Sequence, residues 1–137
     1  MLCNIQDGHI LVSNKHAVIS TSPLGVRLGH IVVATRKHAE SFAELSLDEI
    51  EGLMKTLGQV LVAAEKALPA ERIYVLRVND KLAHLHFHLI PRQTGDDNLG
   101  TFIFGESGWS KTLAQAQSTK ETELFASKFK RNFEAAL

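Results

Sequence analysis

Three histidines alternate with large apolar residues in the segment HLHFHLIPR, residues 84–92. Consecutive side chains on a β-strand point to opposite faces, so His84, His86 and His88 are expected to share one face. A half-buried strand usually places ordinary solvated polar residues at such positions. Here each position holds the side chain that titrates nearest neutral pH. The pattern therefore indicates chemistry on phosphate, proton transfer or metal binding.

Nucleophilic catalysis at phosphorus is the first hypothesis. A neutral imidazole is a good nucleophile, and its phosphoryl or nucleotidyl adduct is labile enough to be hydrolysed. Neighbouring donors must then fix its tautomer and stabilise the non-bridging oxygens and the leaving group. Alternate residues on a strand lie ~6.5–7 Å apart, which is the scale of a phosphate chain. His86 has an imidazole on each side and is the predicted nucleophile.

A metal site is the second hypothesis and ranks below the first. His84 and His88 would lie ~13 Å apart on a flat strand, whereas zinc–nitrogen bonds are ~2 Å long. Further ligands would have to come from other segments, and the candidates are Asp80, Asp96, Asp97 and His30. A nucleotide sensor that binds without turnover is a third hypothesis, because it would use the same pocket as an enzyme.

Composition indicates one soluble globular domain over residues 1–137, with 45% hydrophobic and 22% charged residues. Lys plus Arg and Asp plus Glu both number 15, so the net charge is zero. This balance argues against a general binder of nucleic-acid polymers or membrane surfaces. Cys3 is the only cysteine, and no signal-peptide pattern or apolar run of ~20 residues is present. We therefore expect a cytoplasmic protein.

Five strands are expected, at residues 9–13, 16–20, 31–35, 72–79 and 84–92. The third is almost continuously apolar, which is typical of a central strand covered on both faces. The last two are separated by the polar turn Asn79-Asp80-Lys81, so they are expected to pair as an antiparallel hairpin.

Two helices are expected, each after a capping box: one from Ser46 to Pro69 and one from Ser118. The first carries an apolar stripe in which Met54 is assigned to the core. The second carries Phe125, Phe129 and Phe133 at steps of four, as a core-facing edge. Residues 93–117 are loop-rich, with Trp109 as a core cap or a dimer contact. The order of elements predicts an α+β fold, with one long helix packed on an antiparallel sheet and a C-terminal helix.

The run HLHFHLI fits the signature of the histidine-triad (HIT) family, in which three histidines alternate with hydrophobic residues. The run from Gly29 to Val33, followed by Arg36-Lys37-His38, resembles the upstream glycine-histidine strand of that family. The resemblance spans residues 10–100. It implies a HIT-like α+β homodimer with a nucleotide pocket in each subunit.

The resemblance also implies residue roles. His86 would attack the α-phosphorus of a nucleotide and form a nucleotidyl-histidine, a phosphohistidine intermediate. His88 would contact the phosphate and the leaving group, while His84 would orient the nucleophile and His30 would support it from the neighbouring strand. Asn79 resembles the amide residue that touches the phosphate. The family needs no tightly bound cofactor or metal, although Mg²⁺ can accompany a polyphosphate substrate.

Within the family, Pro91-Arg92 followed by residues 95–98 resembles the dinucleoside polyphosphate hydrolase branch, with nucleoside phosphoramidate hydrolysis as the alternative. The chain has Ser20-Thr21-Ser22-Pro23 where the family places a ribose-binding Asp or Asn. The hydroxyls of Ser20 and Ser22 are therefore candidate nucleoside contacts. Lys81 lies in a shortened loop before the triad and is either a phosphate contact or a solvated turn residue.

Overall fold

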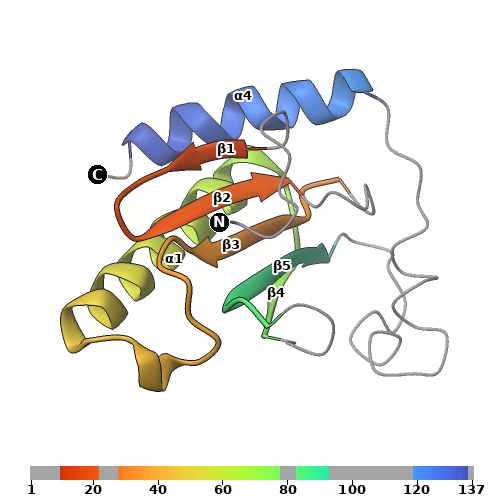
Figure 1. The fold of residues 1–137 in the computed structure, drawn as a ribbon. Coiled ribbons are helices and arrows are strands. Elements are labelled where there is room, and N and C mark those ends of the chain that lie inside the picture. The colour runs from red at the N-terminus through yellow and green to blue at the C-terminus, as the bar shows by residue number, and fades with distance from the viewer. Residues whose placement is uncertain (1–9, 22–27, 78–82, 93–118, 136–137) are drawn as a thin grey trace, which may run out of the picture.

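Five strands form one antiparallel sheet in the order β1-β2-β3-β5-β4 (Figure 1). The computed structural model describes residues 10–21, 28–77, 83–92 and 119–135. The strands are β1 Ile10–Ser13, β2 Ala17–Thr21, β3 Ile31–Thr35, β4 Arg72–Leu76 and β5 His86–Arg92. The helices are the 3₁₀ helix η2 Phe42–Glu44, α1 Leu47–Ala67 and α4 Thr119–Ala135. This arrangement confirms the predicted α+β fold.

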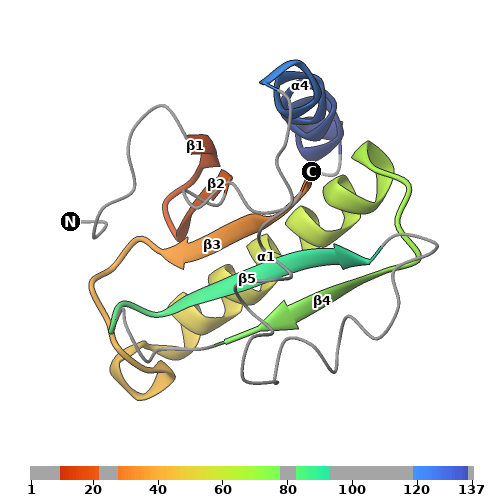
Figure 2. The ribbon, with the colours of Figure 1, turned by 90° about the vertical axis from the view of Figure 1, so that its right-hand side faces the viewer.

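Both long helices belong to one side of the fold. The helix α1 runs along one face of the sheet, behind β5 and β4 in Figure 2, and α4 packs against α1 and β1. The opposite face carries no helix among the described residues. The sheet therefore has a helix face, which holds the main apolar core, and a second face that is available to polar residues.

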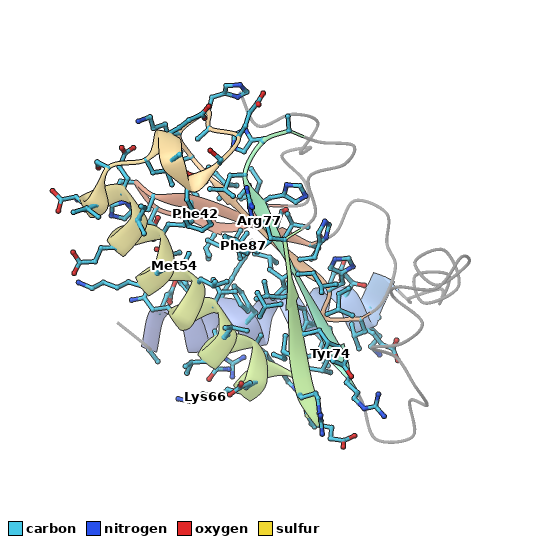
Figure 3. All side chains as sticks on the ribbon, turned by 90° about the horizontal axis from the view of Figure 1, so that it is seen from below. Phe42, Met54, Lys66, Tyr74, Arg77 and Phe87 are labelled. Atoms are coloured by element: carbon cyan, nitrogen blue, oxygen red, sulfur yellow. The ribbon has the colours of Figure 1, made fainter. Side chains whose placement is uncertain are left out.

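The pairing of β3 with β5 decides which residues lie on which face. Val33 pairs with Phe87, and the next pairs on either side are Ala34 with His86 and Val32 with His88. Because sides alternate along a strand, Phe87 faces the helices while His86 and His88 face the other way. The Phe87 ring lies 6.0 Å from that of Phe42 in η2, centroid to centroid, on the helix side (Figure 3). As predicted, β3 is central and buried along its whole length.

The predicted capping box begins α1. The Ser46 hydroxyl accepts from the Glu49 backbone nitrogen at 3.1 Å, and the Glu49 carboxylate accepts from the Ser46 backbone nitrogen at 3.0 Å. The assignment of Met54 to the core is wrong, since it is 37% exposed. The buried stripe runs instead through Leu53, Thr56, Val60, Ala63, Ala64 and Ala67. Met54 follows Leu53 by one residue, a rotation of ~100° around the helix, which turns it out of the core.

The aromatic stripe of α4 is a core element, as predicted. Phe125, Phe129 and Phe133 are all buried, with neighbouring ring centroids 6.1 and 5.9 Å apart. The predicted cap Ser118 and the segment 93–117, with Trp109, lie outside the described residues.

Strand boundaries differ from the prediction by up to three residues, and those of β3 agree with it. The strand β4 ends at Leu76 instead of residue 79, and β5 begins at His86 instead of residue 84. At Leu85 the backbone amide donates to the Ala39 carbonyl at 2.7 Å, and its carbonyl accepts from the Thr35 amide at 3.1 Å. The segment just before β5 is therefore held by the end of β3 and the residues that follow it. The antiparallel pairing of β4 with β5 is confirmed, while the turn at 79–81 lies outside the described residues.

The turn between β1 and β2 contains no glycine and is held by one side chain. Asn14 Oδ1 accepts from the backbone nitrogens of His16 at 2.8 Å and Ala17 at 2.9 Å. Such Asx-type bonds replace the conformational freedom of glycine in tight turns. The amide of Asn14 also donates to Thr56 Oγ1 at 3.0 Å, which ties this hairpin to α1.

Candidate active site

The side of β5 away from the helices carries His86 and His88, and small side chains lie beside them on β3. Ala34 is opposite His86, Val32 is opposite His88, and Ser20 of β2 is opposite Val32. All of these residues except His88 are buried, and His88 is partly buried. On the β3 side of these rows, the neighbouring side chains of Ala34 and Val32 are smaller than an imidazole.

A backbone carbonyl fixes the tautomer of His86. The Nδ1 atom of His86 lies 2.6 Å from the carbonyl oxygen of His84. A carbonyl only accepts hydrogen bonds, so Nδ1 carries the proton. In the neutral ring, Nε2 is then left with its lone pair. The backbone thus holds His86 in the tautomer that a nucleophile requires.

The ring of His84 anchors that carbonyl. His84 Nε2 donates to the carbonyl oxygen of Thr35 at 2.5 Å, and the His84 ring stands edge-on to His38 with centroids 5.4 Å apart. The prediction that all three triad residues belong to one strand is corrected: His84 lies just before β5. It acts on His86 through its main chain, while its side chain fixes that main chain to the end of β3.

His30, the residue just before β3, and His88 of β5 form a second pair. His30 Nε2 lies 3.0 Å from His88 Nδ1, and their ring centroids are 5.2 Å apart. The His88 ring is also edge-on to His86, with centroids 4.9 Å apart. The structure therefore joins His30, His88 and His86 into one contiguous cluster, and His84 joins it through its carbonyl.

Burial keeps the outer pair neutral. Burial, and secondly the charge of His88, lower the pKa of His30 to about 3. Burial, and secondly the charge of His86, lower the pKa of His88 to about 4. Both imidazoles are therefore uncharged at neutral pH, and each can donate through only one nitrogen.

Metal ligation has no support among the residues that the structure covers. Within residues 10–21, 28–77, 83–92 and 119–135, no three His, Cys, Asp or Glu side chains gather as metal ligands. The candidates Asp80, Asp96 and Asp97 lie outside these ranges. In this cluster, Nδ1 of His86 and Nε2 of His84 are already committed to carbonyl oxygens.

The predicted substrate-binding residues are only partly described. Ser20 lies on the histidine face, fully buried, and its hydroxyl has no hydrogen-bond partner among the described residues. Ser22, Asn79 and Lys81 lie outside the described residues. A buried hydroxyl without a partner is costly, and the nucleoside contact predicted for Ser20 stays a prediction.

Two contributors to the site were not predicted. The Thr35 carbonyl holds His84, and the His38 ring packs against it. A carbonyl has no sequence signal, because every residue carries one. The position of His38 in the sequence indicates its place, since it follows β3 by three residues and thus lies at the strand end nearest His84.

The profile of the HIT domain matches residues 5–95. The chain belongs to the HIT domain family. An uncharacterised HIT-like protein of Saccharolobus solfataricus is 32% identical over 108 residues, which cover 72% of this chain and 78% of that protein. A second one, from Methanocaldococcus jannaschii, is 29% identical over 111 residues, covering 74% of this chain and 85% of that protein.

Solved structures give the same fold for this HIT protein. A hypothetical histidine triad nucleotide-binding protein from Sulfolobus tokodaii superposes with a TM-score of 0.70 at 23% sequence identity. The match covers 93% of this chain and 84% of that one.

No described helix has the length and apolar character needed to cross a membrane.

Proposed function

We propose that this HIT protein is a nucleotide hydrolase or transferase that acts at the α-phosphate through a nucleotidyl-His86 intermediate. The main support for this proposal is the hydrogen bond from His86 Nδ1 to the His84 carbonyl. It leaves Nε2 of His86 as the nucleophilic atom. The ring of His88, which lies beside it, can donate a hydrogen bond. Aligned groups of this kind are what nucleophilic catalysis requires.

The proposed first step transfers the nucleotidyl group. The lone pair of His86 Nε2 forms a bond to the α-phosphorus, and the bond from phosphorus to the leaving group breaks. The leaving group departs with that electron pair. His88 can donate a hydrogen bond to the leaving group from its Nε2 when its Nδ1 accepts from His30 Nε2, a tautomer that the 3.0 Å contact permits.

The second step restores the enzyme. Water attacks the α-phosphorus, the phosphorus–nitrogen bond breaks, and its electron pair returns to His86 Nε2. The attacking water releases its proton to the solvent. The product is a nucleoside monophosphate.

The proposed substrate is a dinucleoside polyphosphate. Support comes from the run Pro91-Arg92 and residues 95–98, which resembles that branch, and from the Sulfolobus tokodaii structure, which is described as nucleotide-binding. Ser20 and Ser22 are proposed to contact the nucleoside, and Asn79 and Lys81 the phosphates. No protein-bound cofactor is proposed, and Mg²⁺ would enter with the substrate.

The test is turnover with trapping of the intermediate. The purified protein is incubated with dinucleoside polyphosphates and with a nucleoside phosphoramidate, and intact mass is measured after rapid acid-free quenching. We expect nucleoside monophosphate release and a nucleotidyl mass increment that His86→Ala abolishes. Absence of turnover on both substrates, with no effect of His86→Ala, contradicts the proposal. Tight AMP binding without turnover would indicate a sensor, and stoichiometric zinc would indicate a metal protein.

We also propose a homodimer, formed through β4, in the cytoplasm. The strand β4 is an edge strand, and Val75 on it and Met54 and Val62 on α1 are exposed apolar side chains. Edge strands with apolar neighbours readily pair with a second chain. Val75→Lys is expected to shift the mass in solution, measured by light scattering, from dimer to monomer; a monomeric wild type contradicts the proposal. The single cysteine supports the cytoplasmic location.

A further inference from the structure

Two arginines stand opposite each other where the histidine face ends. Arg72 of β4 pairs in register with Arg92 of β5. Arg92 lies on the same face as His88 and Ile90, because it follows them by even steps along the strand. Like charges directly opposite each other in a sheet are destabilising unless a counter-charge compensates them. A second anion would therefore be favourable here.

One carboxylate serves both guanidinium groups. Glu71 Oε1 lies 3.5 Å from Arg72 Nη2, and Glu71 Oε2 lies 3.4 Å from Arg92 Nε. Within the part of the chain that the structure describes, no other carboxylate pairs with either arginine. The cluster therefore keeps a net charge of about +1 at the end of the face that carries the catalytic histidines.

Arg92 also contacts a residue nearer the histidines. Its Nη1 lies 3.4 Å from the hydroxyl of Tyr74, which is opposite Ile90. Tyr74 is labelled on β4 in Figure 3. This diagonal contact places part of the guanidinium toward the Ile90 row. Ile90 itself is fully buried beside Tyr74 and Leu76. Along this face, His88 is therefore followed by the apolar side chain of Ile90 and then by the partly exposed guanidinium of Arg92.

We propose that Arg92, supported by Arg72 and Tyr74, binds the phosphates of the substrate that lie beyond the α-phosphate. This inference rests on the proposed function and names its substrate class: nucleotides with a long polyphosphate leaving group. His88 and Arg92 are four residues apart on one strand, a distance of ~13 Å. The phosphate attacked by His86 cannot also reach Arg92, whereas phosphates farther along a chain that leaves past His88 can.

The arginine is suited to this task. A guanidinium forms bidentate, charge-assisted hydrogen bonds to phosphate oxygens. The Glu71 carboxylate competes with a phosphate for the guanidinium of Arg92, so it weakens the binding of an anion there. Removal of Arg92 and removal of the Glu71 charge should therefore act in opposite directions.

The test measures kcat/KM on a series that differs in leaving-group length: dinucleoside tri-, tetra- and pentaphosphates and a nucleoside phosphoramidate. For Arg92→Gln we expect a loss that grows with length, to about 10-fold or more on the longest substrate. The phosphoramidate should change by less than about 2-fold, since it places no phosphate near Arg92. For Glu71→Gln we expect a gain on the long substrates, and Tyr74→Phe should give a smaller loss than Arg92→Gln.

Two outcomes overturn the inference. If Arg92→Gln lowers kcat/KM equally on every substrate, Arg92 has a structural role. If Glu71→Gln lowers kcat/KM on the long substrates, the ion pair of Glu71 stabilises the fold. A binding measurement distinguishes failure of this inference from failure of the proposed function. In the His86→Ala background, Arg92→Gln should weaken binding of adenosine tetraphosphate and leave AMP binding unchanged, measured by titration calorimetry. Unchanged tetraphosphate binding rejects the inference even if no substrate is turned over.

Discussion

The two faces of β5 are similarly buried at the neighbouring residues Phe87 and His86 but are built for different purposes. Phe87 on the helix face is 8% exposed, and His86, its neighbour on the other face, is 5% exposed. Leu85, Phe87 and Leu89 belong to the apolar core formed with α1 and α4. His86 and His88 instead contact a carbonyl oxygen and another imidazole.

The difference shows where stability is gained and where it is given up. Burial of apolar side chains stabilises the fold by ~25 cal/mol per Å². Burial of an imidazole costs free energy unless each polar atom is satisfied, and it holds the ring in its neutral form. In the proposed mechanism a neutral ring with a defined tautomer is the reactive species, which would explain why the histidine face bears that cost. Substitutions on the two faces should therefore separate activity from stability.

His86→Ala should have the largest effect, and it should be on activity. Loss of the nucleophile is expected to lower kcat/KM for a dinucleoside polyphosphate by at least about 10³-fold. The free energy of unfolding should fall by only ~1–2 kcal/mol, since one buried hydrogen bond and one ring are removed. Steady-state kinetics and urea denaturation measure the two quantities. A residual activity above about a tenth of wild type would exclude His86 as the nucleophile.

Phe87→Ala should reverse that pattern. Truncation of a buried Phe costs ~3–5 kcal/mol of unfolding free energy through lost burial and the cavity that remains. The folded fraction should keep far more activity than His86→Ala, because His86 is held by the His84 carbonyl and not by Phe87. Urea denaturation and activity normalised to folded protein test this. If Phe87→Ala inactivated the folded protein as fully as His86→Ala, the two faces would not be independent.

Acid should destabilise the protein through the His30–His88 pair. Their pKa values, lowered to about 3 and about 4, lie below the unfolded value of 6.5. The unfolded chain then binds more protons than the folded one below pH 6.5, so stability is complete above that pH and falls as pH drops toward 4. The full effect is on the order of a few kcal/mol.

His30→Gln isolates this contribution. The amide can still hydrogen-bond to His88, but it does not titrate. Denaturant midpoints between pH 7 and 5, above the range in which most carboxylates titrate, should fall less steeply for this variant than for wild type. Identical slopes would mean that the pair does not control acid stability.

The alternation of residues 84–92 predicted both faces of β5, and the capping box at Ser46 predicted the start of α1. These succeeded because period-two patterning and capping chemistry are local. The error at Met54 arose because several stripes fit an apolar helix, and only packing against the sheet and α4 selects one of them.

Site details that depend on distant contacts could not be predicted from residue types. His84 was expected to orient His86, but the residue type did not indicate that its carbonyl would contact His86 while its ring binds Thr35. Sequence patterns do not show which backbone oxygen meets which ring. The role of Asn14 in its turn is a similar case, since its partner on α1 is 42 residues away.

Ser20→Ala should have the smallest effect, and its sign is informative. The hydroxyl of Ser20 is fully buried without a partner among the described residues, on the side of the sheet that carries His88. Its removal takes away a desolvation penalty, so the unfolding free energy should rise by ~1 kcal/mol. Thr56→Val is the matched control. Thr56 is equally buried, but its hydroxyl bonds to the Gly52 carbonyl and the Asn14 amide, so that variant should be destabilised.

The same substitution then tests whether the hydroxyl is kept for a ligand. A residue that lowers stability but persists on the reactive face is expected to serve binding or catalysis. Ser20→Ala should therefore raise the melting temperature while it weakens AMP binding several-fold, by about the strength of one hydrogen bond. If stability rises and AMP affinity is unchanged, Ser20 makes no contact with the nucleotide. If stability falls instead, the hydroxyl is satisfied within the protein, and Ser20 is not a polar group reserved for substrate.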